Sequence, residues 1–348
     1  MEAERSLRYV RRHMRALVWQ PWLGRLSRAL APAEGPKGLL LLNAFAADIT
    51  LNFLCNLHAF EGALERTVLL CLDERACQKL RSAYPQPRFP IIQAHVSDVP
   101  FAMGQPAYQL FQAFRARLIA RLLPHLPSFW LLQADTLWTQ NLYQFPASPG
   151  VLFDRAGPPD SAQGQLIAGG CFLLHGGSLL APLFEQTSEL LQAWYAPDNA
   201  IFGFLCASLP SARCSFLPWT LVANWLYFAQ PPLEPTTPYP AAVQLDSGAN
   251  SRGKLAWMSA MGIRFLQQGP TSNCTPPTRR QLASLSLQGQ QPQLSSQLQW
   301  AFLGQAVAVK SWKQHRLFQA LGGWVAWLAP DWLRVRLPLL SYFVCLTM

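Results

Sequence analysis

The sequence has few charged side chains and no long apolar run. Charged residues make up 13% of the 348 residues, whereas apolar residues make up 51%. A disordered chain shows the opposite balance, so a folded, globular protein is expected. No stretch of about 20 uncharged apolar residues occurs, and a conventional membrane-spanning helix is therefore not predicted. The first residues also lack the uninterrupted apolar core of a signal peptide.

Several motifs that identify a catalytic or metal site are missing. The chain has no glycine-rich phosphate loop and no strand–Ser–helix nucleophile motif. The six histidines do not cluster, and the eight cysteines show no C-x-x-C or zinc spacing. Cys71 and Cys171 lie in apolar runs and are expected to be small buried side chains. Cys206 and Cys214 flank a short turn and can pair in an oxidising compartment, which the sequence leaves open.

Positive charge is concentrated at the two ends of the chain. Residues 37–278 carry 14 basic and 14 acidic side chains, whereas residues 1–36 carry seven and three and residues 279–348 carry seven and one. A nucleic-acid-binding domain needs a basic face on its folded body, so nucleic acid is not predicted as a partner. Basic ends suit contact with an anionic membrane surface or an acidic partner, or they are solvated tails. Residues 1–36 have near-helical apolar spacing, which predicts interfacial binding or docking on the body.

Strand-like and helix-like segments alternate through the first half of the chain. Short apolar runs predict strands at 38–43, 67–72, 89–92 and 129–134. Periodic segments that lie between these runs predict helices. This alternation is typical of an α/β domain with a mostly parallel sheet flanked by helices. The second half is less regular, with shorter strands predicted at 151–154, 170–174, 215–218 and 241–245.

Composition divides the chain into four parts. The first is a basic N-terminal segment and linker, the second is the α/β body, the third is a polar linker rich in Pro, Ser and Gln, and the fourth is a basic, aromatic and helical C-terminal segment. Their bounds are 1–36, 37–268, 269–298 and 299–348.

Polar side chains follow three of the predicted strands. The apolar run 129–134 ends on Asp135, the run 67–72 ends on Asp73, and the first run ends on Asn43. In open parallel sheets, ligands bind beyond the carboxyl ends of the strands. Asp135 is therefore placed where a metal or charged ligand would be held. The alternative is a structural role, with Asp73 capping the next helix and Asp135 capping a turn.

Nine segments of the body carry a recognisable pattern: 42–43, 48, 52–55, 68–74, 114–118, 133–138, 168–172, 198–199 and 244–265. Taken in this order, they resemble the nucleotide-diphospho-sugar transferase domain family. The resemblance covers roughly residues 37–268 and implies a GT-A-like fold, with a Rossmann-type mostly parallel sheet and a less regular acceptor-side half. It implies transfer of a sugar from a nucleotide-sugar donor to a glycan, glycoprotein or small-molecule acceptor. It also implies the Golgi or secretory lumen.

The segment Gln133-Ala134-Asp135 resembles the family's D-x-D element. The resemblance implies that Asp135 binds a divalent metal, Mn²⁺ or Mg²⁺, which neutralises the donor's diphosphate. Gln133 stands where the first acid is expected, and it offers a hydrogen bond to the nucleotide but no charge. The histidine expected in the closing segment is missing, so Asp246 is the second predicted metal ligand.

Other site residues follow from the same resemblance. Asp135 and Asp198 are the predicted catalytic residues. Asp198 is predicted to orient the acceptor or the transferred sugar, and its alternative role is to cap a helix. Arg115 and Lys254 are predicted to contact the diphosphate. For Lys254 the alternative is an exposed helix lysine. The predicted nucleotide-binding set is Asn43, Asp73, Arg115, Gln133 and Lys254.

Three departures from the family pattern support a second interpretation. Gln133 replaces an acid, Ala168 replaces an expected asparagine, and the closing histidine is missing. A catalytically impaired transferase-like protein, which binds a sugar or partner without turnover, would show such changes. A third interpretation is a peripheral membrane or scaffold protein that uses its basic ends.

Overall fold

The computed structural model describes residues 2–278 with several gaps. The predicted helical segment 299–348 and most of the predicted linker 269–298 lie outside the described residues. So does Asp246. The gaps are at 18, 20–21, 33, 102–104, 147, 162, 210–212, 225, 230–239, 246–250 and 267–273.

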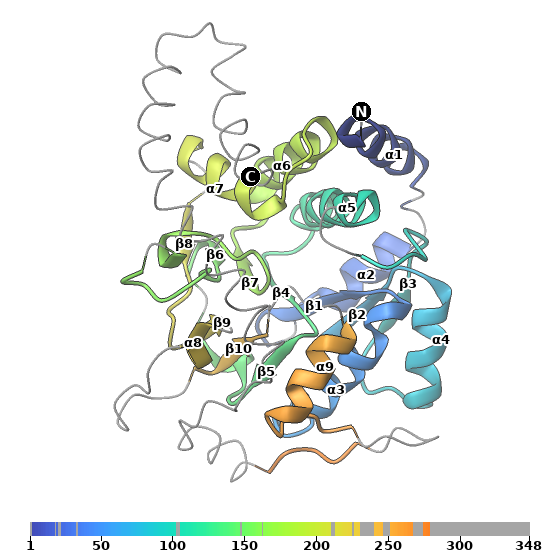
Figure 1. Ribbon diagram of the computed structural model, residues 1–348, viewed down its shortest axis with the longest axis vertical. Helices are drawn as coiled ribbons and strands as arrows, with labels where there is room; N and C mark the ends of the chain where they lie inside the picture. The colour runs from blue at the N-terminus through green and yellow to red at the C-terminus, as the bar shows by residue number, and fades with distance from the viewer. Residues whose placement is uncertain are drawn as a thin grey trace, which may run out of the picture.

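A seven-stranded sheet forms the centre of the body (Figure 1). Its order is β3-β2-β1-β4-β7-β6-β8, and four of its six strand pairs are parallel. The antiparallel pairs are β4–β7 and β6–β7. The predicted mostly parallel α/β sheet is thus confirmed. The strands are β1 Lys37–Leu42, β2 Thr67–Cys71, β3 Ile91–Gln93, β4 Ser128–Leu132, β6 Gly150–Phe153, β7 Phe172–His175 and β8 Cys214–Phe216.

Helices cover both faces of this sheet because its central strands are apolar on both sides. Successive side chains of a strand point to opposite faces, so Leu39 joins one core cluster while Leu40 joins the other. Helices α2, α5, α6 and α7 pack in the first cluster, and α3, α4 and α9 pack in the second (Figure 1). The helices are α2 Trp22–Leu30, α3 Ala47–Leu57, α4 Glu74–Ala83, α5 Pro106–Leu122, α6 Ala181–Ala193, α7 Asp198–Ser208, α8 Leu226–Ala229 and α9 Ser251–Ala260.

A second sheet of three short strands closes the body beyond the end of β4. Its order is β5-β10-β9, with β10 antiparallel to β5 and parallel to β9. The side chain of Asn56 on α3 fixes this sheet, because its amide exchanges two hydrogen bonds with the backbone of Trp138. The sequence predicted β10 but neither β5 nor β9. These strands are β5 Thr136–Trp138, β9 Val222–Asn224 and β10 Ala242–Gln244.

The basic N-terminal segment forms two helices that dock on the body. Helix α1, Glu2–Ala16, contacts α5 and buries Val10 and Met14. Helix α2 buries Trp22, Leu26 and Leu30. Of the two predicted roles, docking is the one that these contacts support. Within the described part of the chain, no helix combines the length and apolarity needed to cross a membrane.

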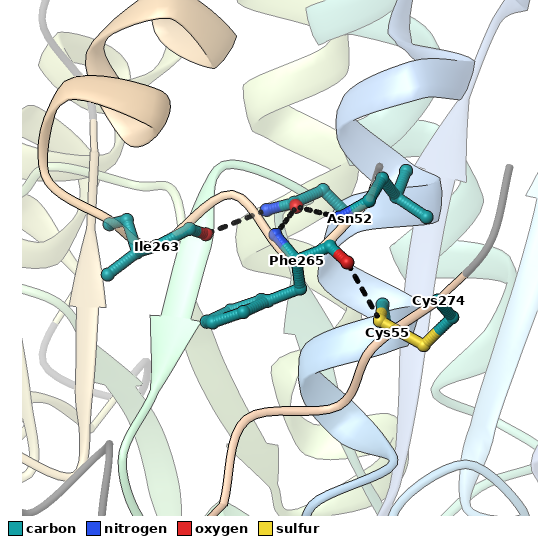
Figure 2. Close-up of a disulfide and its surroundings, with 6 residues drawn as sticks. Asn52, Cys55, Ile263, Phe265 and Cys274 are labelled. Carbon is teal, nitrogen blue, oxygen red and sulfur yellow. Dashed lines mark hydrogen bonds between the residues drawn. A yellow bond between two sulfur atoms is a disulfide. The ribbon is translucent and has the colours of Figure 1, made fainter. Parts of the chain in front are cut away.

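A disulfide ties the segment after α9 to α3 (Figure 2). It joins Cys55 and Cys274, which are 219 residues apart. One turn earlier on α3, Asn52 donates to the carbonyl of Ile263 at 3.3 Å and accepts from the N–H of Phe265 at 2.7 Å. These contacts hold the closing segment against the first half of the body.

Two further disulfides change the interpretation of the cysteines. Cys71 is buried, as predicted, and it also pairs with Cys77, which was not predicted. Cys71 ends β2 and Cys77 lies one turn into α4, so the two cysteines come together only after folding. Their spacing in the sequence therefore did not indicate the pair. Cys206 and Cys214 are paired. Cys171 is buried and unpaired, as expected.

Candidate functional site

Asp135 lies just past the carboxyl end of β4, at the junction between the two sheets. Its carboxylate accepts a hydrogen bond from Nζ of Lys254, with 2.5 Å between Nζ and Oδ2. Its backbone carbonyl accepts from the N–H of Leu245 at the end of β10, at 2.7 Å. Two residues predicted separately as metal ligand and diphosphate ligand are therefore in direct contact.

The two glutamines beside this ion pair contact each other. Nε2 of Gln244 donates to Oε1 of Gln133, with 2.5 Å between the atoms. Gly170 lies against the amide of Gln244, and a Cβ at Gly170 would come within 2.2 Å of it. A side chain at this position would displace the Gln244 amide. The carbonyl oxygen Oε1 of Gln244 and Oγ1 of Thr136 are buried without a hydrogen-bond partner among the described residues, which leaves acceptor groups for a ligand or water.

Asp154 binds the turn before β7, which lies against Gln244. It follows β6, is 2% exposed, and accepts hydrogen bonds from the backbone N–H groups of Gly169, Gly170 and Cys171. Burial raises the pKa of Asp154 to about 7, although these hydrogen bonds favour the ionised form and oppose the increase. Burial, together with the negative charges of Asp154 and Asp135, also raises the pKa of the Cys171 thiol. The site therefore contains a second buried acid close to Asp135.

Sequence reasoning missed the importance of Asp154. The signal was the same as for Asp135 and Asp73, because the short apolar run 151–153 ends on an acid. The partners of Asp154 could not be found from the sequence, since its hydrogen bonds span 15 to 17 residues of irregular chain.

A second cluster forms around Asp198, at the start of α7. Its carboxylate makes an ion pair with Arg115 of α5 and accepts from Nε2 of Gln112 at 3.1 Å. The Arg115 and Asp198 side chains are 5% and 6% exposed. Arg115 is thus held by a carboxylate, and its predicted contact with the diphosphate stays a prediction. Arg117 points elsewhere and pairs with Glu185, as the two-residue spacing along α5 requires.

The turn before β7 lies between the two clusters. A Cβ at Gly169 would lie 3.4 Å from Cβ of Asn199, the residue after Asp198, while Gly170 lies against Gln244. Gly169 has a φ of +74°, a conformation that glycine adopts without strain. The N–H of Ala168 donates to the carbonyl of Asp154 at 3.0 Å. One short segment thus places the Asp198 cluster next to the Asp135 cluster.

Asn43 and Asp73 bind neighbouring backbone. Asp73 caps α4 by accepting from the N–H of Ala76 at 2.8 Å, and its other oxygen accepts from the N–H of Ala44 at 2.7 Å. Asn43 donates to the carbonyl of Val99 at 3.0 Å. The capping role that the sequence offered as the alternative for Asp73 is the observed contact. A role for either residue in nucleotide binding stays a prediction.

A cavity of about 550 Å³ opens beside Asn199. It lies between α7, the β6–β8 edge of the main sheet and the segment 165–167. Apolar and aromatic groups dominate its lining, which includes Phe204 and Phe216. Gln165 and Ser215 add polar atoms. Its position next to the Asp198 cluster makes it a candidate for the part of the site that holds a second ligand.

Comparison with known proteins identifies the family. Residues 62–258, more than half of the chain, match the model of the family described as nucleotide-diphospho-sugar transferase. A search of curated proteins gives no match. The matched segment includes Asp135, Asp198, Gln244 and Lys254, so both clusters lie within it.

Several solved structures are similar at low sequence identity. The WbbM bifunctional glycosyltransferase is 11% identical, with a TM-score of 0.42 over 63% of this chain and 47% of that one. Mouse xyloside xylosyltransferase 1 is 10% identical, with a TM-score of 0.41 over 61% and 97%. GlyE of Streptococcus pneumoniae TIGR4 is 12% identical, with a TM-score of 0.42 over 73% and 60%. The chain thus spans less than two thirds of the WbbM and GlyE chains.

Proposed function

The chain belongs to the nucleotide-diphospho-sugar transferase family, and on that premise we propose that it transfers a sugar from a nucleotide-diphosphate donor to an acceptor. The observation that supports this most directly is the pair formed by Asp135 and Lys254 at the carboxyl end of β4. Ligands of open α/β sheets bind at this edge. A lysine held there offers positive charge to a diphosphate.

The proposed reaction needs stabilisation of the leaving group. The bond between the sugar's anomeric carbon and the donor phosphate oxygen breaks, and its electron pair stays on the nucleoside diphosphate. A bond forms from the anomeric carbon to the acceptor hydroxyl oxygen, and the hydroxyl proton passes to the released diphosphate. Lys254 is proposed to offset the charge that develops on the leaving oxygen. Asp198, held by Arg115 and Gln112, is proposed to orient the transferred sugar.

A divalent metal, Mn²⁺ or Mg²⁺, is the cofactor that the family resemblance implies. The described groups around Asp135 do not fit such an ion. Its carboxylate already holds an ammonium group, and Oε1 of Gln133 accepts from the neighbouring amide of Gln244. No step of the proposed reaction is therefore assigned to a metal.

The acceptor is proposed to enter through the cavity beside Asn199. Aromatic faces such as those of Phe204 and Phe216 suit the apolar face of a sugar ring, while Gln165 and Asn199 offer hydrogen bonds. A glycan, a glycoprotein or a small glycosylated molecule would each present such a ring.

We also propose that the chain works in an oxidising compartment such as the Golgi or secretory lumen. The disulfides joining Cys55 to Cys274 and Cys206 to Cys214 support this, because disulfides persist in such compartments. Membrane contact through the basic ends is a further proposal. The outward-facing arginines of α1, Arg8, Arg12 and Arg15, support it.

A donor-hydrolysis screen tests the proposed transfer. Wild-type protein is incubated with a panel of UDP-, GDP- and CMP-sugars, and release of the nucleotide is measured with and without candidate acceptors. We expect release from at least one donor and its loss in Asp135→Ala. Nucleotide binding without release would favour the catalytically impaired interpretation. Absence of both binding and release would contradict a nucleotide-sugar function.

A further inference from the structure

The cation beside the Asp135 carboxylate is a side chain of the same protein, Lys254. Nζ of Lys254 lies 2.5 Å from Oδ2, and the two side chains are 16% and 10% exposed. A surface pair in the same protein shows the contrast, since the Lys79 and Asp48 side chains are 44% and 59% exposed. Water and salt screen a partly buried pair much less than a surface pair. The attraction between Asp135 and Lys254 is therefore screened much less than that of the surface pair.

The positions where the family pattern expects an acid and a histidine carry neutral side chains. Gln133 stands where the family resemblance places an acid, and Gln244 lies in the closing segment where a histidine was expected. Their amides bind each other. Asp154, the other buried acid close to Asp135 among the described residues, is already bound by three backbone N–H groups. Within the ranges that the structure describes, no group of three or more His, Cys, Asp or Glu side chains is placed to hold a metal. With Lys254 beside it, Asp135 presents a neutral pair to an incoming ion, whereas Mg²⁺ and Mn²⁺ need anionic oxygen ligands.

The fold fixes Lys254 in this place. Lys254 lies in the first turn of α9, whose buried face includes Met258. Asn52 of α3 donates to the sulfur atom of Met258 at 3.5 Å, and the disulfide between Cys55 and Cys274 ties down the chain beyond the helix. A metal ion at Asp135 would have to displace a lysine that is held by its own helix.

We propose that Lys254 takes the place of the divalent cation, so that this chain binds a nucleoside diphosphate without metal. This inference rests on the proposed function. An ammonium group has three N–H donors, so one lysine can bridge Asp135 and the oxygens of a diphosphate. Asp135 then acts as a positioning residue that orients Lys254, and the contact between Gln133 and Gln244 supplies no anionic ligand for a metal.

Calorimetric titration of the whole chain tests the inference. UDP, GDP, CDP and ADP are each titrated into wild-type protein, once in EDTA and once in excess MnCl₂. We expect at least one to bind, with dissociation constants that agree within about twofold between the two conditions. Binding that tightens by about tenfold or more with Mn²⁺, which is about 1.4 kcal/mol, would overturn the inference and leave the proposed function standing. Binding in neither condition would overturn both.

Variants of Lys254 test whether this lysine is the group that binds the diphosphate. In EDTA, Lys254→Gln is expected to weaken binding by at least about tenfold, because a charge-assisted contact is lost. Lys254→Arg keeps the charge and is expected to retain most of the affinity. Lys79→Gln removes an equally charged surface lysine and is the matched control, expected to leave affinity unchanged. Equal affinity of Lys254→Gln and wild type in EDTA would contradict the proposal, provided that thermal unfolding shows the variant folded.

Manganese alone gives an independent readout. Paramagnetic resonance of Mn²⁺ titrated into the protein reports bound ion directly and needs neither donor nor turnover. We expect the same weak binding in wild type and Asp135→Asn, and tighter binding in Lys254→Gln, where Asp135 is released. Tighter Mn²⁺ binding by wild type than by Asp135→Asn would place the metal at Asp135 and overturn the proposal.

Discussion

The two halves of the body, residues 37–134 and the closing half 135–268, use strand-end polar residues in different ways. In the first half, Asp73 caps the helix that follows its own strand and binds an N–H three residues away. In the closing half, Asp135 binds Lys254, which lies 119 residues further along the chain. Asp198 likewise pairs with Arg115 across 83 residues. The same type of residue at the same type of position therefore has a local role in one half and a long-range role in the other.

The difference teaches which polar residues depend on the completed fold. A local cap forms as soon as its helix forms, so its loss costs little. A buried charge with a distant partner is satisfied only when both segments are in place, and removing one partner leaves the other uncompensated in the interior. The closing half should therefore be the more sensitive to single substitutions, and the following changes test this.

The largest effect is expected at the ion pair between Asp198 and Arg115. Asp198→Ala leaves a guanidinium that is 5% exposed without its carboxylate, and we expect a loss of about 3–5 kcal/mol in the free energy of unfolding. Urea unfolding measures it. Glu185→Ala is the control, because Glu185 is 41% exposed in its pair with Arg117 and should cost about 1 kcal/mol or less. Similar losses in both variants would contradict the distinction.

The next largest effect is a pH dependence that comes from Asp154. Its pKa is raised from 3.8 to about 7, so between these values the folded protein holds a proton that the unfolded chain releases. Stability therefore falls as the pH rises through this window and levels off above about 7, with a total change of about 4 kcal/mol. Urea unfolding between pH 4.5 and 8 (about half-unit steps suffice) measures the change.

Asp154→Asn is the comparison for the pH series. The amide cannot titrate, so the difference in stability between wild type and variant should shrink as the pH rises from about 5 to about 7. The variant is expected to be less stable throughout, since an amide nitrogen faces N–H donors. Parallel curves for the two proteins would show that Asp154 does not titrate in this range.

The disulfides give a third comparison between long-range and local links. Cys55 and Cys274 are 219 residues apart, whereas Cys206 and Cys214 are eight apart. Replacing the first pair by serine should cost about 2–4 kcal/mol, and replacing the second should cost less, because a longer closed loop restricts the unfolded chain more. Thermal unfolding of the two double variants ranks them. A larger loss from the eight-residue pair would reverse the comparison.

The accuracy of the sequence-based predictions differs between the same two halves of the body. The strands and helices of the first half were found because period and apolar runs are local signals. Strands β5 and β9 were not predicted. Each is three residues long and is defined by partners in another segment, as the pairing of Val243 with both Leu137 and Ala223 shows. The helical prediction for 299–348 lies outside the described residues and stays a prediction.

The candidate site was predicted residue by residue but not contact by contact. The sequence identified three of the site residues, Asp135, Gln133 and Lys254. It did not predict the pairing of Asp135 with Lys254, because this depends on where the fold places α9 relative to the end of β4. Asp154 was missed for the same reason, although it ends an apolar run as Asp135 does. A motif identifies which residue is chemically suited to a site, whereas the partner that determines its role is set by tertiary structure.

The smallest effect is expected at Asp73, and it decides whether the first half is purely structural. Asp73→Ala removes the cap of α4 and should cost about 1–2 kcal/mol, while Asp73→Ser keeps an oxygen that can accept from the N–H of Ala76 and should restore part of this. If Asp73 only caps, both variants bind the nucleoside diphosphates with wild-type affinity in calorimetry. If it also contacts the nucleotide, affinity falls in the folded Asp73→Ser variant. That result would show that the first half, like the second, uses strand-end polar residues for function as well as for folding.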